Sequence, residues 1–291
     1  MTNGSFLIKL QKSIGTPSSS AQNNLNSWKK IIKTVPANGL LICHRDPSET
    51  CSVPVSLLSP IFTQFIYDLD NIDITPKDCE FVSKLCISMC GAFGSEKERT
   101  KEFTDFLKDY TGLLLGSEER NQFKTDGSLK FANGALYCYL EVKVDKGTGN
   151  VDPYMQNIAY YIRNLGINEA ISTQYPCFLL ELCGTAFSVC GAVNTEQNII
   201  CDPLSPTYQL FCNQEFMFTQ KITKLFASLR KSLLTLHEQG IQGLLSPPTS
   251  FPYLSSFPDR IKKNKLSGRC DTNREYRDLY SQPSLSISRK K

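Results

Sequence analysis

The chain has 291 residues, of which 41% are hydrophobic and 21% are charged, and its formal net charge is +4. This length suits one domain of ordinary size with tails, or two small domains, and the hydrophobic fraction is enough for a sizeable core. The small net charge excludes a strongly basic nucleic-acid coat protein, but it is compatible with a local positive groove.

The chain contains 12 cysteines and 2 histidines, and no cysteine pair has the C-x-x-C spacing that structural zinc sites use. Because disulfide-stapled miniproteins are much shorter, we predict buried thiols in a reducing, intracellular compartment. The N-terminus has no charged region followed by an apolar core, so no ordinary signal peptide is expected. The most apolar run, Phe178 to Val193, is too short to span a bilayer, and no membrane partner is expected.

Residues 1–53 are predicted to be a partly disordered segment, with a polar low-complexity run from Ser18 to Asn24. The tripeptide His-Arg-Asp that begins at His44 matches the catalytic loop of protein kinases. That loop needs an asparagine five residues after the aspartate, where this chain has Cys51, and no Asp-Phe-Gly follows. We therefore interpret the tripeptide as a polar turn before Pro47.

Two helices are predicted where a capping residue precedes a proline. Ser59 and Pro60 begin the first helix, and Thr75 and Pro76 begin the second. Both segments carry apolar residues at helical spacing. They are expected to form a helical prologue packed on a sheet.

A third helix is predicted from Ser95 to Tyr110. The pattern Ser95-x-x-Glu98 is a capping box, which would use Glu98 at the helix start. Glu96 stands seven residues before Phe103, on the apolar face of this helix, where a carboxylate needs a partner. A solvated glutamate favoured by the helix dipole is the alternative for Glu96.

A hairpin is predicted at Asn133-Gly134, and its second strand runs from about Ala135 to Val144. Side chains alternate between the two faces of a strand, so Glu141 and Lys143 leave the same face side by side. That face is predicted to hold Tyr137, Tyr139, Glu141 and Lys143, and the opposite face Leu136, Cys138, Leu140, Val142 and Val144.

Asp126, on the neighbouring strand, would bring a second carboxylate close to Glu141 and Lys143. Two adjacent carboxylates raise each other's pKa unless a cation lies between them. Mg²⁺ is held in proteins by one or two carboxylates, waters and substrate phosphate, and it stabilises charge that develops on a phosphoryl group. The three residues therefore predict a site for Mg²⁺, or Mn²⁺, that acts on phosphate.

The series of Asp126, a hairpin and Glu141-Val142-Lys143 resembles the PD-(D/E)XK nuclease superfamily, although Thr125 replaces the proline before the aspartate. The helix that follows carries Gln156 and Tyr160 four residues apart, which is similar to the Q-x-x-x-Y motif of the RecB-like branch. The resemblance implies α/β structure with the restriction-endonuclease-like mixed sheet flanked by helices.

The resemblance also implies a set of roles in the site. Lys143 would position the attacking water, Gln156 and Tyr160 would support the substrate or the lysine, and Glu96 would be an additional acid near the metal. The implied metal ligands are Asp126, Glu141, the carbonyl of Val142, and Glu96.

A wider pattern resembles the nuclease-like domains of fungal Crinkler-type effectors, which are often followed by a protein kinase domain. The resemblance covers about Pro54 to Gln239, and this chain shows no kinase motifs after it. The segments that carry it are Val55–Phe62, Gly147-Thr148-Gly149 before Asp152-Pro153-Tyr154, and Cys201–Leu204.

Further along, Asp152-Pro153 is predicted to begin the helix of Gln156 and Tyr160, which should end at Gly166. Near-continuous apolar runs predict strands covered on both faces at Cys177–Cys183 and Ala186–Val193, and a further strand is expected at Asn198–Cys201. A long amphipathic helix is predicted from Phe216 to His237. Its polar face carries Lys221, Lys224, Arg230 and Lys231, which is interpreted as a solvated face with nucleic-acid contact as the alternative.

From residue 240 the composition changes to a Pro/Ser-rich tail with basic runs at 260–265 and 288–291, which are typical of nuclear-localisation or nucleic-acid patches. The predicted organisation is an N-terminal segment (1–53), a nuclease-like domain (54–239) and a basic tail (240–291).

The leading functional hypothesis is a metal-dependent nuclease, with DNA favoured over RNA, that acts as an intracellular, nuclear, Crinkler-like effector or toxin. A catalytically inactive nuclease-fold module that binds nucleic acid or a host protein is the alternative. A soluble α/β domain with an incidental surface Glu-Val-Lys is the third reading, and a homodimer is left open.

Overall fold

The structure is a computed structural model that describes residues 8, 11, 41–44, 53–120, 123–145, 152–165, 175–195, 198–211 and 216–242. The chain divides into two units, Met1–Ser250 and Phe251–Lys291, and every described residue belongs to the first. The glycine run at 147–149, the tail beyond residue 242 and most of the segment 1–53 lie outside the described residues.

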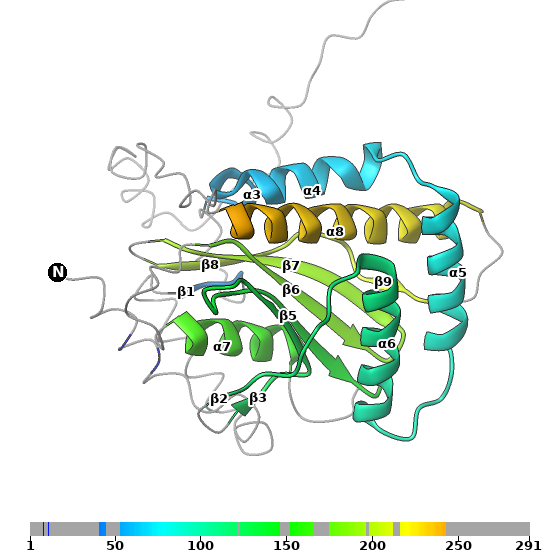
Figure 1. Cartoon of the computed structure of the whole chain (residues 1–291), viewed down its shortest axis with the longest axis horizontal. Helices are drawn as coiled ribbons and strands as arrows, with labels where there is room; N and C mark the ends of the chain where they lie inside the picture. The colour runs from blue at the N-terminus through cyan, green and yellow to red at the C-terminus, as the bar shows by residue number, and fades with distance from the viewer. Residues whose placement is uncertain are drawn as a thin grey trace, which may run out of the picture. The chain divides into compact units, whose positions relative to one another are not determined.

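A mixed sheet of seven strands forms the centre of the first unit (Figure 1). Its order is β1 (Leu41–Ile42), β8 (Ile199–Pro203), β7 (Ala186–Asn194), β6 (Cys177–Cys183), β5 (Leu136–Lys143) and β4 (Gly127–Lys130), with β9 (Tyr208–Gln209) paired to β7. The β1–β8 and β5–β6 pairs are parallel and the others are antiparallel. A separate ribbon joins β2 (Glu119–Arg120) to β3 (Phe123–Lys124). The α/β prediction with a mixed central sheet is confirmed.

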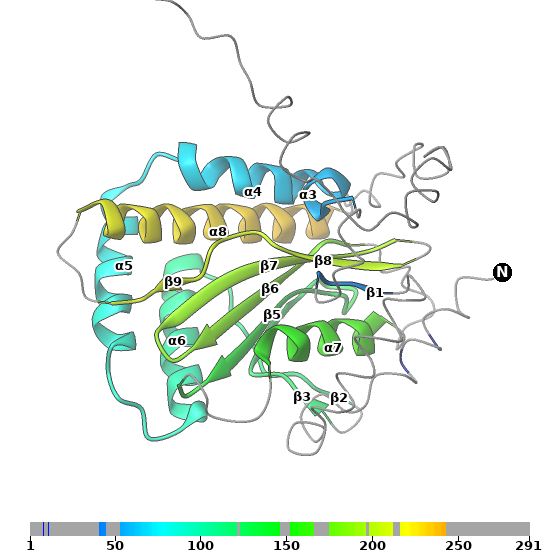
Figure 2. The same ribbon diagram turned by 180° about the vertical axis from the view of Figure 1, so that it is seen from behind.

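Helices cover both faces of this sheet, as the opposite views in Figures 1 and 2 show. The helices α3 (Val55–Leu58), α4 (Pro60–Asn71) and α8 (Phe216–Gln242) lie on one face, and α7 (Pro153–Leu165) lies on the other. On the first face, Phe62 of α4 meets Phe178 edge to face at 5.1 Å, and Phe226 of α8 stacks on Phe187 at 4.9 Å. The helices α5 (Pro76–Met89) and α6 (Glu96–Thr111) join this layer, since Phe81 of α5 meets Phe226 and Phe103 of α6 meets Phe187.

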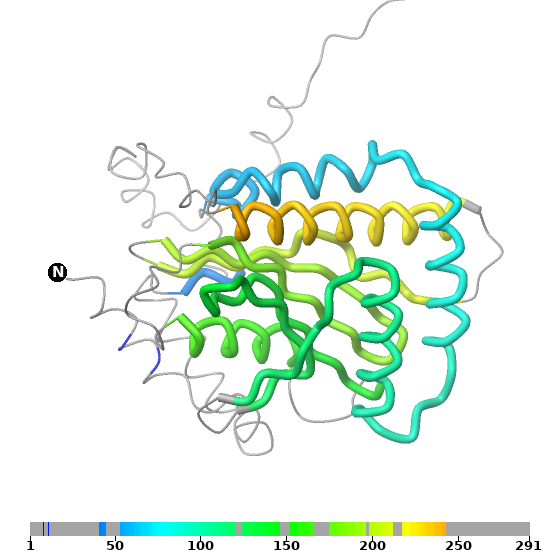
Figure 3. Tube along the Cα trace, in the orientation of Figure 1, coloured from blue at the N-terminus to red at the C-terminus, as the bar shows by residue number. Residues whose placement is uncertain are grey.

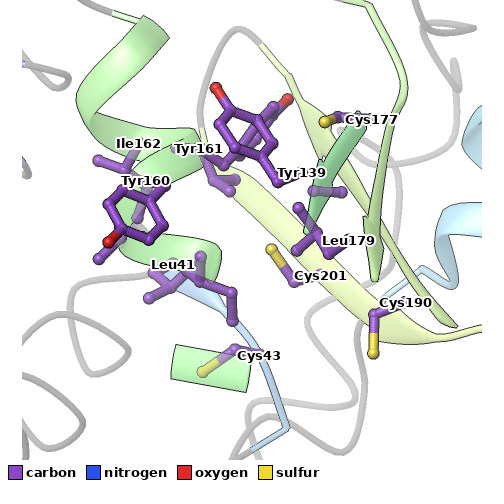
Figure 4. Packing of buried hydrophobic residues seen from close by; sticks show 14 of the residues in the cluster. Leu41, Cys43, Tyr139, Tyr160, Tyr161, Ile162, Cys177, Leu179, Cys190 and Cys201 are labelled. Atoms are coloured by element: carbon purple, nitrogen blue, oxygen red, sulfur yellow. The ribbon is translucent and has the colours of Figure 1, made fainter. Parts of the chain in front are cut away.

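The α7 face is packed with aromatic and small apolar side chains (Figure 4). Tyr139 and Tyr161 meet edge to face at 6.4 Å, and Leu179 and Cys201 belong to the same buried cluster. Leu41, from the predicted N-terminal segment, joins this cluster, so the packed unit includes a strand that precedes residue 54.

The predicted helix starts are where the sequence placed them, but the capping bonds differ in detail. Thr75 forms a reciprocal capping box with Asp78 at the start of α5. The hydroxyl of Ser95 accepts a hydrogen bond from the Glu98 amide (3.1 Å), but the Glu98 carboxylate accepts from the Gly94 amide (3.0 Å) instead of closing the box. Glu98 is nevertheless engaged at the helix start, as predicted.

The predicted hairpin joins β4 to β5, and Gly134 takes a φ of 83°, which favours glycine. The clean alternation expected along β5 is wrong at its start. Leu129 pairs with Cys138 whereas Lys130 pairs with Leu136, so Tyr137 is the extra residue of a β-bulge. As a result Leu136 joins the cluster under α7, while the Tyr137 hydroxyl is 3.0 Å from His237 of α8.

The solvated basic face expected for α8 is found only in part: Lys221 is exposed, whereas the other three cations have partners. Arg230 forms an ion pair with Asp78 (3.3 Å), and Lys231 forms one with Asp68 (2.8 Å). Lys224 donates a hydrogen bond to the Asp70 carbonyl. Acidic side chains of α5 and α4 thus pair with Arg230 and Lys231, which argues against these two cations binding nucleic acid.

His44, the first residue of the kinase-like tripeptide, is bonded through Nε2 to the Asp202 carboxylate, whose second oxygen accepts from the Val55 amide (2.6 Å). The chain therefore uses His44 and Asp202 to hold the start of α3 against the end of β8. Arg45 and Asp46 lie outside the described residues.

No helix in the described ranges has both the length and the apolar character needed to cross a membrane.

Candidate active site

The charged residues predicted from the sequence meet where β4 begins and β5 ends. Gly127 of β4 pairs with Leu140 of β5, so Asp126 stands beside Glu141 on the neighbouring strand. After β5 the chain returns through α7 and enters β6 parallel to β5 (Figure 3). This crossover places α7 over the same face of the sheet that carries Glu141.

Asp126 is tied to the backbone of β5. Its Oδ2 accepts a hydrogen bond from the Val142 amide at 2.8 Å, which fixes the carboxylate between Glu141 and Lys143 along the strand. Burial raises the pKa of Asp126 to about 6; the negative Glu96 adds to this rise, while the Val142 bond and two lysines act against it. An anion in this position is costly unless a cation is supplied.

Glu141 is almost completely buried, with 1% of its surface exposed. Burial raises its pKa well above the ordinary value, and repulsion by Asp126 adds to the effect, although Lys143 opposes it. Its Oε1 bonds to the Lys143 ammonium, and its buried Oε2 has no hydrogen-bond partner among the described residues. A buried carboxylate oxygen without a partner is uncommon in folded proteins and marks a position suited to an ion or a water.

Lys143 lies between two carboxylates. It is bonded to Glu141, and its Nζ is 3.4 Å from Oε2 of Glu96. Burial would lower the pKa of this lysine, but Glu141, Glu96 and Asp126 outweigh burial and raise it. The three carboxyl groups therefore favour the ammonium form of Lys143, which is a hydrogen-bond donor.

Glu96, expected as the additional acid, thus reaches the site from the first turn of α6. Its side chain is 42% exposed, so it does not have the fully buried position that the helical stripe predicted. Its contact is with the lysine, and its role as a metal ligand stays a prediction. Glu98, which was expected at the helix start, remains there and accepts from the Gly94 amide.

The Gln156–Tyr160 pair of α7 forms a chain of hydrogen bonds toward Asp126. Nε2 of Gln156 donates to the Tyr160 hydroxyl (3.1 Å), which donates to the Lys124 carbonyl (2.8 Å). Burial raises the pKa of Tyr160, and the negative Glu141 is the next cause, so the hydroxyl stays protonated beside the carboxylates. The pair therefore fixes the backbone at Lys124, two residues before Asp126. The i, i+4 spacing showed that the two side chains share a helix face, but nothing in the sequence identified the Lys124 carbonyl as their target.

The site residues fit a divalent ion. The Oε2 of Glu141, which has no hydrogen-bond partner among the described residues, and the adjacent carboxylate of Asp126 would supply two hard oxygen ligands, of the kind that Mg²⁺ takes from proteins. In the described ranges, no group of three or more His, Cys, Asp and Glu side chains is arranged to hold a metal, so water and substrate oxygens would complete the coordination. The Val142 carbonyl stays a predicted ligand.

Comparison of the chain with protein-family models, with curated proteins and with solved structures gave no match.

Proposed function

We propose that the chain is a metal-dependent nuclease of the PD-(D/E)XK type. One observation carries the proposal: the Val142 amide holds Asp126 beside the buried pair of Glu141 and Lys143, with one Glu141 oxygen unpartnered. Two acids and a lysine converge on one point from two adjoining strands, with a helix acid and the α7 pair around them. The element order α6–β2–β3–β4–β5–α7–β6, in which a helix crossover joins the parallel strands β5 and β6, supports a restriction-endonuclease-like core.

A divalent ion bound by Asp126 and Glu141 would lower the pKa of a bound water and stabilise the charge that develops on the phosphoryl group. Lys143 remains protonated, so it donates a hydrogen bond to the phosphate or to the attacking water and does not take the water's proton. Glu96 limits the movement of this ammonium. Tyr160 and Gln156 keep the Asp126 segment in place while the substrate binds.

The natural substrate under this proposal is DNA, in an intracellular and nuclear setting, with a role as an effector like the Crinkler proteins. The basic runs in the tail support this setting because such runs are typical of nuclear-localisation and nucleic-acid patches.

The test compares the purified chain with Glu141→Gln and Lys143→Met on supercoiled plasmid DNA with Mg²⁺ or Mn²⁺. We expect metal-dependent cutting, and a loss of about 10²-fold or more in each variant, because each removes a group that stabilises the transition state. Lys84→Met is the matched control, since Lys84 is an exposed lysine paired with Glu80 on α5.

A second measurement does not depend on activity. Mg²⁺ should raise the melting temperature of the wild-type chain and of Lys84→Met, but not that of Glu141→Gln, because a ligand that binds the folded state stabilises it. If Glu141→Gln and Lys143→Met cut DNA like the wild type, the assignment of these residues to an active site would be refuted. A wild-type chain that binds DNA, but does not cut it in the presence of any divalent metal tested, would instead favour the inactive binding module.

A further inference from the structure

Thr125 precedes Asp126 at the place where the resembling nuclease motif has a proline. It is buried, with 1% of its surface exposed. Its amide donates a hydrogen bond to the Glu118 carbonyl (3.0 Å), and its hydroxyl accepts one from the Glu118 amide (3.1 Å). The Ser117 hydroxyl donates to the Thr125 carbonyl (2.7 Å). Two neighbouring residues thus hold Thr125 by its amide, its hydroxyl and its carbonyl.

The same segment, residues 116–118, also holds the chain beyond Asp126. The Gly116 amide donates to the Ser128 carbonyl (3.1 Å), and the Ser128 amide donates to the Gly116 carbonyl (2.8 Å). Asp126 therefore lies between two points at which the backbone is fixed. The segment follows α6 in the chain, and the first turn of that helix carries Glu96. The segment thus connects the helix of one acid of the site to the backbone of another.

This hold on the backbone bears on the Asp126 carboxylate. The side chain has two rotatable bonds with preferred rotamers, so a fixed backbone leaves the carboxylate few positions. In the observed position its Oδ2 accepts from the Val142 amide at 2.8 Å. A proline at position 125 has neither an amide hydrogen nor a hydroxyl, so both bonds to Glu118 would be lost. Threonine supplies a restraint that proline cannot.

We propose that Thr125 is a positioning residue that, through residues 116–118, directs the Asp126 carboxylate to the metal-binding position. The inference rests on the proposed function, because it takes Asp126 as a metal ligand. Thr125 itself takes no part in the chemistry. One consequence is that Thr125→Pro, which restores the residue of the motif, lowers activity and does not raise it.

The first test measures hydrogen exchange of single amides by NMR, in the full chain with EDTA. Thr125→Val keeps the shape of the side chain and removes its hydroxyl. The Val142 amide, which reports the Asp126 carboxylate, should then exchange roughly fivefold faster, the factor expected for one lost hydrogen bond. The Gly184 amide, which donates to the Lys143 carbonyl (3.0 Å), should keep its rate. Thr125→Ser retains the hydroxyl and should restore the wild-type exchange at Val142.

A matched control removes a buried hydroxyl elsewhere in the sheet. The Ser205 hydroxyl accepts a hydrogen bond from the Val189 amide (3.0 Å), and Ser205→Ala should leave the exchange at Val142 unchanged. The second test uses plasmid DNA and Mg²⁺. Thr125→Val should lower kcat by roughly tenfold at an unchanged KM, because a misplaced catalytic group slows the chemical step. Thr125→Pro should lose at least as much, whereas Thr125→Ser and Ser205→Ala should cut like the wild type.

The outcomes separate the inference from the proposed function. If the Val142 amide of Thr125→Val exchanges at the wild-type rate, the inference is overturned, even in a chain that cuts DNA. Equal acceleration at Val142 and Gly184 overturns it as well, because it would reflect a general loss of stability. In a chain that cuts, a wild-type kcat for Thr125→Val also overturns it. Faster exchange confined to Val142 in a chain that never cuts supports the hold on Asp126 and refutes only the nuclease proposal.

Discussion

Asp126→Asn should make the metal-free protein more stable at pH 8 while it abolishes cleavage. The reason is that burial raises the pKa of Asp126 from 3.8 to about 6. A carboxyl group whose pKa is raised on folding contributes stability that is fully present below pH 3.8 and is lost as the pH rises through about 6. At pH 8 the wild-type protein has lost all of this stability because Asp126 is ionised. An asparagine does not ionise, so the variant loses none of it.

The size of the effect follows from the same pKa. A rise from 3.8 to about 6 corresponds to about 3 kcal/mol in the free energy of unfolding, and this is an upper limit because water partly screens the side chain. The amide oxygen of asparagine can still accept from the Val142 amide, but the loss of a charged acceptor costs about 1 kcal/mol. The net gain is about 1–2 kcal/mol, or roughly 3–6 °C in melting temperature for a unit of this size.

Thermal unfolding followed by circular dichroism in EDTA, at pH 4 and pH 8, measures this difference. The stabilisation by Asp126→Asn should be present at pH 8 and absent at pH 4. Asp105→Asn, which changes an exposed carboxylate paired with Lys101, should show no such dependence on pH. If Asp126→Asn destabilised the protein at pH 8, or changed its stability equally at both pH values, the reasoning from burial of the Asp126 charge would be refuted.

Three further predictions concern the surroundings of the site. Tyr160→Phe should lower the free energy of unfolding, measured in urea, by about 1 kcal/mol, because the hydrogen bond to the Lys124 carbonyl is lost. It should also lower kcat by roughly tenfold, and an unchanged kcat would contradict the positioning role. Glu96→Gln should lower kcat yet keep the melting shift caused by Mg²⁺, whereas Glu98→Gln should cut at the wild-type rate; equal kinetics of the two variants would deny Glu96 a place in the site. Gly184→Ala should lower the melting temperature by several degrees. Gly184 has a φ of 60°, and a Cβ there would lie 2.7 Å from a neighbouring carboxylate oxygen. An unchanged melting temperature would show that this turn relaxes freely.

Much of the architecture followed from short-range patterns. Proline after a capping residue predicted the starts of α4 and α5, and Asn133-Gly134 predicted the hairpin before β5. The near-continuous apolar runs at β6 and β7 predicted strands covered on both faces, because an uncovered face would carry polar residues. These features depend on neighbours a few residues away, which the sequence displays directly.

The errors arose where distant segments meet. The bulge at Tyr137 depends on how β4 pairs with β5, and no local pattern announced it. The pairing of Arg230 and Lys231 on α8 was missed because their partners, Asp78 and Asp68, lie more than 140 residues earlier in the chain. The strand at Leu41 was missed because a two-residue strand has no periodicity of its own and exists only through its pairing with β8.

The candidate site shows the same division. By itself, the sequence determined that Glu141 and Lys143 share a face of one strand and that Gln156 and Tyr160 share a face of one helix, since both follow from the repeat of a regular element. Only the tertiary structure decided that the Val142 amide holds Asp126 beside them, that Glu96 reaches the lysine, and that Tyr160 binds the Lys124 carbonyl. Those contacts join separate elements, and the packing of α6 and α7 against the sheet sets the distances between them.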